Sequence, residues 1–196
     1  AQWSAGAVAS GNSDVTFTNV KILNNLSTSH AGGLNMSNGN IVMTDVEISG
    51  NQATGGHGGG FYMNVGLTVT MTNVLVSDNY SSGVGPGMLT YNASNASSPN
   101  SVTLTNVTIV NSSHNNAGSG DEHKAGLYVW SHSNVTMNNS IVWGNDKSIV
   151  LGSSGTQIEV TYSDIQGGYS GTGNINSNPV FDSDYSLSST SPCINS

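Results

Sequence analysis

One eight-residue pattern occurs six times in this chain of 196 residues. In each copy, apolar and polar residues alternate, the chain turns, typically at Asn or Asp, and the alternation resumes. Alternation with a period of two is typical of strands, so each copy predicts two short strands joined by a corner. The copies begin at residues 15, 41, 69, 102, 135 and 158. A strand repeat of about 20 to 50 residues predicts a solenoid.

Stacking the copies in register places like residues above one another. Because successive side chains of a strand face opposite sides, one column points inward and the next outward. The expected inward column is Phe17, Met43, Met71, Leu104, Met137 and Val160. The expected outward column is Thr18, Thr44, Thr72, Thr105, Asn138 and Thr161.

This stacking predicts an all-β fold, a single-stranded parallel β-helix of about six to seven coils with three short strands per coil. The usual crossover preference predicts a right-handed helix. We expect coils over residues 1–168, with 1–14 as a partial first coil, and a final coil or capping segment over 169–196. The chain begins inside a repeat without a polar cap, which implies missing upstream sequence or a neighbouring molecule. Open ends would allow head-to-tail self-association.

The composition restricts the possible partners. Charged residues make up 7% of the chain, which has three lysines and arginines together and a net charge of −8. A surface this acidic repels phosphate backbones, so we expect no nucleic-acid partner. No apolar run approaches the roughly 18 residues of a membrane helix. The single Cys193 excludes an internal disulfide, and a Lys-poor surface rich in Asn, Ser, Thr and Gly favours an extracellular location.

Two columns of amide side chains should stabilise the corners, because Asn tolerates the left-handed conformation and stacked amides hydrogen-bond between coils. The first column is Asn19, Asp45, Asn73, Asn106 and Asn139. The second column is Asn25, Asn51, Asn79 and Asn145, and Ser112 interrupts it. Glycines then open each third strand, whose core residues should be Leu34, Phe61, Met88 and Leu127.

The glycine pairs of Gly32-Gly33-Leu34 and Gly59-Gly60-Phe61 alternate with segments that end in Asn, at 22–25, 48–51 and 76–79. This alternation resembles polymorphic outer-membrane-protein-type repeats and other secreted bacterial right-handed β-helix proteins. The segments 139–145, 162–168, 174–181 and 191–194 resemble the end of the β-helix in choice-of-anchor Q surface proteins. The resemblance implies export and surface display, and it implies no catalytic residues.

An enzyme acting on polysaccharides is the first alternative, since pectin and alginate lyases share this fold. A lyase needs a basic residue beside a carboxylate-binding cation, but Lys21, Lys124 and Lys147 lie far apart in the sequence. Asp45 and Glu47 are the nearest carboxylate pair on a strand, and Asp45 occupies the Asn corner column. We therefore expect no catalytic residues and no cofactor, with a structural cation such as calcium left open.

Histidines precede three of the third strands. His30, His57 and His123 each lie four residues before a core residue, and His30 and His57 should stack one coil apart. They could share a metal, or each flat ring could cover a glycine turn.

Aromatic residues occupy outward positions of the third strand. Tyr62, Leu89 and Tyr128 form one column, and Asn64, Tyr91 and Trp130 form the next. We expect an exposed aromatic stripe for sugar stacking or protein contact, flanked by inserted loops at 91–100 and 112–124. Asn92 and Asn95 in the first loop are the plausible glycan carriers among the Asn-x-Ser/Thr sequons.

Paired outward threonines give a second alternative. The pairs Thr16/Thr18, Thr70/Thr72 and Thr103/Thr105 are typical of ice-binding solenoids, although Val42, Asn138 and Glu159 interrupt them and threonine is also a favoured strand residue. The first interpretation is a non-catalytic surface, adhesin-like or fibre-forming module that presents a rigid face to a glycan or a protein.

Overall fold

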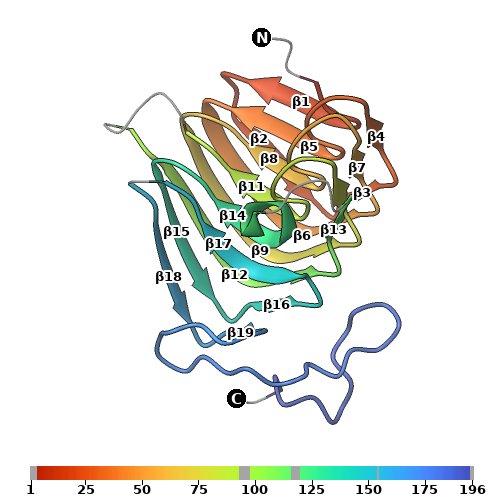
Figure 1. Ribbon diagram of the computed structural model, residues 1–196, viewed down its shortest axis with the longest axis vertical. Helices are drawn as coiled ribbons and strands as arrows, with labels where there is room; N and C mark the ends of the chain where they lie inside the picture. Colours follow the sequence, from red (N-terminus) through yellow and green to blue (C-terminus); the bar gives the residue numbers. More distant parts are fainter. Residues whose placement is uncertain (1–3, 93–97, 116–119, 154, 195–196) are drawn as a thin grey trace.

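A computed structural model describes residues 4–92, 98–115, 120–153 and 155–194. All described strand pairs between the named strands are parallel, and they form three sheets that wrap around one interior (Figure 1). Successive strands of each sheet come from successive coils, so the chain is a parallel β-helix of six coils. The fold class predicted from the repeat is therefore confirmed.

Each wall of the β-helix is one sheet or half of one. Sheet A contains β1 (Val8–Gly11), β5 (Leu34–Ser37), β8 (Phe61–Met63), β11 (Met88–Thr90), β14 (Ala125–Val129) and β17 (Lys147–Leu151). Sheet B contains β2 (Val15–Thr18), β3 (Lys21–Leu23), β6 (Gly39–Ser49), β9 (Leu67–Ser77), β12 (Asn100–Val110), β15 (Ser133–Asn138), β16 (Ile141–Trp143), β18 (Gln157–Thr161) and β19 (Asp164–Ile165). Sheet C contains the two-residue strands β4 (Leu26–Ser27), β7 (Gln52–Ala53), β10 (Tyr80–Ser81) and β13 (Ser113–His114). A short 3-10 helix, η1 (Asp121–Lys124), precedes β14.

The inward column of sheet B is in register over all six coils. Phe17 pairs with Met43, Met43 with Met71, and the series continues through Leu104 and Met137 to Val160. These six side chains are buried and belong to one continuous core. Each Å² of apolar area that this column removes from water stabilises the fold by about 25 cal/mol. A single coil could not bury its apolar face alone.

The corner of sheet B depends on one left-handed residue in each coil. Asn19, Asp45, Asn73, Asn106 and Asn139 have φ between 49° and 56°, and Tyr162 takes the same position at 48°. The side chains of this exposed column also bond from coil to coil, since Nδ2 of Asn73 donates to Asp45 Oδ1 and Nδ2 of Asn106 donates to Asn73 Oδ1, both at 3.1 Å. All five positions thus have the left-handed conformation expected of them, and the described side-chain bonds join Asp45, Asn73 and Asn106.

The second amide column differs from the prediction in its backbone. The left-handed residues at this corner are Asn24, Gly50, Asp78, Asn111 and Gly144, one position earlier than the predicted asparagines. Asn51, Asn79 and Asn145 instead point inward and are buried. The predicted ladder exists: Asn79 Oδ1 accepts from the backbone N–H of Asn51 at 2.9 Å and from its Nδ2 at 3.1 Å.

Glycines make room for this buried ladder. A Cβ at Gly60 would lie 2.9 Å from Asn79 Nδ2, and a Cβ at Gly126 would lie 2.5 Å from Asn145 Nδ2. At Gly60 and Gly126, glycine is thus required by the close approach of an Asn side chain. A residue with a Cβ at these positions would collide with the buried amide.

The segment after β19 crosses the end of the last coil (Figure 1). Ile165 N–H donates to Ile175 O at 3.1 Å, and Tyr162 N–H donates to Thr172 O at 2.8 Å. A second copy stacking head to tail on this end would have to displace the segment. The prediction of self-association through open ends therefore does not fit the C-terminal end. The described residues include no helix long and apolar enough to cross a membrane.

Replacing Ser112 by Asn should raise the thermal stability. Ser112 stands in the buried amide column, its N–H donates to Asn145 Oδ1 at 2.9 Å, and its own Oγ is buried without a hydrogen-bond partner. The side-chain oxygen of an Asn at position 112 could accept a hydrogen bond from Asn79, just as Asn79 Oδ1 accepts from Asn51. One added buried hydrogen bond is worth about 1 kcal/mol, or a rise in Tm of about 2 to 4 °C, measured by calorimetry.

Asn51→Ser is the matched control, because it places a serine in the amide ladder at the coil next to Asn79, as Ser112 does on the other side. We expect it to lower the free energy of unfolding by about 1 to 3 kcal/mol, since it leaves buried groups unpaired. An unchanged or lower Tm for Ser112→Asn would contradict the account of the ladder.

Candidate functional site

The outer face of sheet A places the predicted aromatic columns together. Tyr62 pairs with Leu89 and Leu89 with Tyr128, so the first column is in register. Trp130 N–H donates to Thr90 O and Tyr91 N–H donates to Met63 O, which continues the second column in the same register. The arrangement of these residues was therefore predictable from the sequence.

The exposure of these residues was not predictable from the sequence. Leu89 is completely buried, and Tyr62 and Tyr128 are each only 6% exposed. They pack in a second hydrophobic cluster with Ala31, Val84 and Ala125. Ala31 and Val84 come from segments that lead into strands of sheet A, and Ala125 opens β14. The expectation of an exposed stripe is wrong for this column, because these segments fold back over the sheet.

Tyr91 and Trp130 lie at the border of the cluster and are half-buried. Their ring centroids are 4.4 Å apart, and Trp130 stacks on Tyr128 at 5.6 Å with an angle of 25° between the rings. His57 meets the indole edge-on at 6.3 Å. We call these four residues, His57, Tyr91, Tyr128 and Trp130, the Trp130 patch.

Two tyrosines of this face, Tyr62 and Tyr128, have a raised pKa and stay neutral. Burial, followed by the charge of Tyr91, raises the pKa of Tyr62 to about 12. Burial, followed by the charge of Glu122, raises the pKa of Tyr128. Neutral phenols both donate and accept hydrogen bonds, so this face combines aromatic surface with polar edges.

The predicted histidine column also forms. The rings of His30 and His57 stack at 5.0 Å with an angle of 24°. His30 Nδ1 accepts the backbone N–H of His57 at 3.1 Å, and His57 Nδ1 accepts that of Val84 at 3.0 Å. A Cβ at Gly56 or Gly83 would clash with these rings, so each ring covers a glycine turn of the next coil.

These hydrogen bonds occupy the ring nitrogens that a metal ion would need. A neutral imidazole whose Nδ1 accepts a hydrogen bond carries its proton on Nε2, so neither His30 nor His57 offers a free lone pair. His123 uses its Nδ1–H to donate to Gly83 O at 3.0 Å. Within the described ranges, no group of three or more His, Cys, Asp or Glu side chains is arranged to hold a metal ion.

The carboxylates considered for catalysis are engaged elsewhere. Asp45 holds the left-handed corner, as an Asn would, and accepts from Asn73. Glu47 pairs with Lys21 at 2.7 Å on the second half of sheet B. A further carboxylate, Asp121 of η1, was not a catalytic candidate and pairs with Lys147 of β17 at 3.2 Å.

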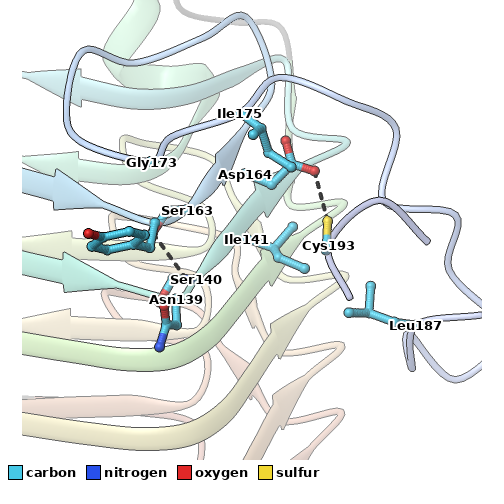
Figure 2. Close-up of a pocket in the computed structure, with 10 residues that line it drawn as sticks. Asn139, Ser140, Ile141, Ser163, Asp164, Gly173, Ile175, Leu187 and Cys193 are labelled. Carbon is cyan, nitrogen blue, oxygen red and sulfur yellow. Dashed lines mark hydrogen bonds between the residues drawn. The ribbon is translucent and has the colours of Figure 1, made fainter. Parts of the chain in front are cut away.

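A cavity of about 290 Å³ lies under the C-terminal segment (Figure 2). Asp164 and Cys193 point toward each other there, and the thiol donates to Asp164 Oδ2 at 3.1 Å. Burial, followed by the bond to Asp164, raises the pKa of Cys193 to about 12. Because the thiolate is the nucleophilic form, this thiol is inert, and the pair joins the segment to the last coil.

Sequence reasoning missed a second clasp. The Tyr185 hydroxyl donates to Asp78 Oδ1 at 2.8 Å and accepts from Asn111 Nδ2 at 2.8 Å. Asp78 and Tyr185 are 107 residues apart, and no repeat relates them. No periodic signal could have indicated this contact.

Two asparagines, Asn92 and Asn95, were predicted to carry glycans. Asn92 is fully buried and its Nδ2 donates to Ser98 O at 2.8 Å, so the nitrogen that a glycan would occupy is covered. The prediction for Asn92 therefore does not fit the structure. Asn95 lies outside the described residues.

Comparison with protein families gives one match. A family model described as "Right handed beta helix region" matches residues 2–183. The comparison with curated proteins and the comparison with solved structures return no match.

The histidine column should make stability depend on pH. Burial, then the charges of His30 and His123, lowers the pKa of His57 from 6.5 to about 4. The folded state therefore favours neutral His57: its contribution is complete above pH 6.5 and is lost as pH falls toward 4. A shift of this size corresponds to about 3 kcal/mol without screening, and solvent screening reduces it to roughly 1 kcal/mol.

Denaturant unfolding between pH 7.5 and pH 4 should show this loss in the parent and less of it in His57→Gln. His132→Gln is the control, since His132 lies outside the stacked pair and donates to Asn92 O. Equal pH dependence in the parent and in His57→Gln would refute the assignment.

Proposed function

This chain belongs to the family of right-handed β-helix regions, and from that premise we propose that it is a non-catalytic, extracellular module that presents a rigid face to a glycan. The interior of the solenoid is filled by side chains, so a ligand has to bind on an outer wall. Function then depends on which wall carries residues suited to recognition.

The half-buried Trp130 is the observation that supports this proposal most. Its indole is fixed between Tyr91 and Tyr128 and beside His57. An indole held in place by neighbours loses little conformational entropy on binding. Aromatic rings of this kind stack on the C–H faces of sugars, and their exposed edge meets polar groups.

The surroundings of the patch suit a hydroxylated ligand. Beside the indole lies the neutral phenol of Tyr128, whose pKa is raised by burial and then by the charge of Glu122. Carboxylates and phenols accept and donate hydrogen bonds to sugar hydroxyls. A net charge of −8 disfavours strongly acidic glycans, so we expect a neutral or basic sugar.

The resemblance to polymorphic outer-membrane-protein-type and choice-of-anchor Q proteins supports the extracellular location. In that setting the solenoid would act as a stalk or adhesin part that holds the patch away from the cell. No step of this proposal needs a cofactor or a catalytic residue.

Trp130→Ala should weaken glycan binding. Truncating a central tryptophan of a binding face commonly costs more than about 1 kcal/mol, and about 1.4 kcal/mol corresponds to a tenfold weaker Kd. We expect a loss of at least about this size on a glycan array, followed by calorimetric titration of the best ligand.

Trp143→Ala is the matched control. Trp143 is also half-buried but lies on β16 of sheet B, so its removal should leave binding unchanged. Equal binding by the parent and Trp130→Ala would exclude the Trp130 patch as the site. Binding of a protein partner that also depends on Trp130 would replace the glycan by a protein ligand.

The protein should not cleave the array ligands or a panel of acidic polysaccharides. We expect no new reducing ends and no unsaturated products, because Asp45 and Glu47 already serve as structural partners. Depolymerisation of any substrate, lost in Glu47→Gln, would establish the enzymatic alternative.

A further inference from the structure

The outer face of the first half of sheet B is a regular array of threonines. Thr16, Val42, Thr70, Thr103, Thr136 and Glu159 form one column in register. Thr18, Thr44, Thr72, Thr105, Asn138 and Thr161 form the neighbouring column. We call these twelve positions the threonine face, and the six strands that carry them lie side by side in Figure 1.

The hydroxyls of this face are available to solvent. Thr16, Thr70, Thr103 and Thr136 are exposed, and Thr44, Thr72 and Thr105 are half-buried by their neighbours. Among the described hydrogen bonds, only Thr161 of the threonine face accepts from a protein group, Nδ2 of Asn138 at 2.8 Å. The other threonine hydroxyls are left to bond water.

The face has fixed spacings in two directions. Neighbouring coils are about 4.8 Å apart and alternate residues along a strand are about 6.6 Å apart. Threonine is β-branched, so its χ1 is restricted, and each methyl and hydroxyl keeps a defined place. The result is a two-dimensional lattice of alternating methyl and hydroxyl groups on a stiff wall.

Two other outward columns of the described strands do not repeat one residue type in this way. The corresponding column on the second half of sheet B reads Lys21, Glu47, Leu75, Thr108 and Ile141. The column on sheet A reads Asn35, Tyr62, Leu89 and Tyr128. Strand propensity alone would allow Val, Ile or Tyr at exposed positions as well as Thr, so it does not explain a threonine lattice on one wall.

Charge is also excluded from the centre of this face. Of its twelve positions only Glu159 is charged, and it lies in the last coil. The interruption at Val42 keeps the branched shape and the methyl group of threonine. A charged group holds its own hydration shell in an arrangement that differs from a crystal lattice, whereas methyl and hydroxyl groups at lattice spacing order water without this competition.

We propose that the threonine face binds ice. The two spacings are close to repeats of the hexagonal ice lattice, so water bonded to the hydroxyls and held between the methyl groups matches a crystal plane. Because the wall is rigid, this ordering needs no rearrangement on binding. The site is separate from the Trp130 patch, which lies on sheet A, and either can exist without the other.

The test compares ice activity of the parent with that of Thr103→Lys, in the central coils of the face. Lysine adds length and charge among Thr70, Thr105 and Thr136, so we expect loss of most thermal hysteresis and of ice shaping. Thr108→Lys is the matched control, since it lies on the same strand β12 beyond the corner, and it should keep the parent's activity. Circular dichroism and Tm establish that all three proteins are equally folded.

Trp130→Ala should also keep full ice activity, which separates this site from the glycan proposal. A folded parent that neither shapes ice nor lowers the freezing point at millimolar concentration would overturn the inference. Equal activity of the parent and Thr103→Lys would do the same, because ice binding would then use another surface.

Discussion

The whole molecule depends on the in-register pairing of each coil with the next. Parallel pairing fixes the rise per coil at about 4.8 Å, and it places every side chain directly above its equivalent. Phe17, Met43 and Met71 then fill the interior as one column, although each strand is too short to form a core by itself. A shift by a single residue would exchange the inner and outer faces of a coil, so the register is held by the entire buried surface.

The corners make this register possible, and they do so in two chemically different ways. The exposed corner uses a left-handed Asn or Asp whose side chain bonds along the outside, as between Asn73 and Asp45. The buried corner uses an inward amide, as in Asn51 and Asn79, and requires a glycine in the opposing strand. The interior therefore contains a polar ladder beside an apolar core, in which amides bond from coil to coil and Ser112 makes the one break described above.

The outer walls, in contrast, are free to differ, and their differences carry the functional proposals. Sheet A is covered in part by the segments that contain His30, His57 and Val84, which leaves Trp130 and Tyr91 at the edge of a small aromatic cluster. The first half of sheet B presents exposed threonines, among them Thr70, Thr103 and Thr136. A single rigid scaffold thus offers two surfaces of different chemistry, a localised aromatic patch and an extended lattice of threonines.

The sequence by itself determined the coils, the inward columns, the exposed Asn corner and the stacking of His30 on His57, because each of these follows from a period along the chain. It did not determine what covers Tyr62 and Leu89, since that depends on how the irregular segments between strands fold back onto sheet A. It also did not determine the contacts of Asp164 with Cys193 or of Tyr185 with Asp78. Those contacts join a non-repeating segment to distant coils, and only the three-dimensional path of the chain brings them together.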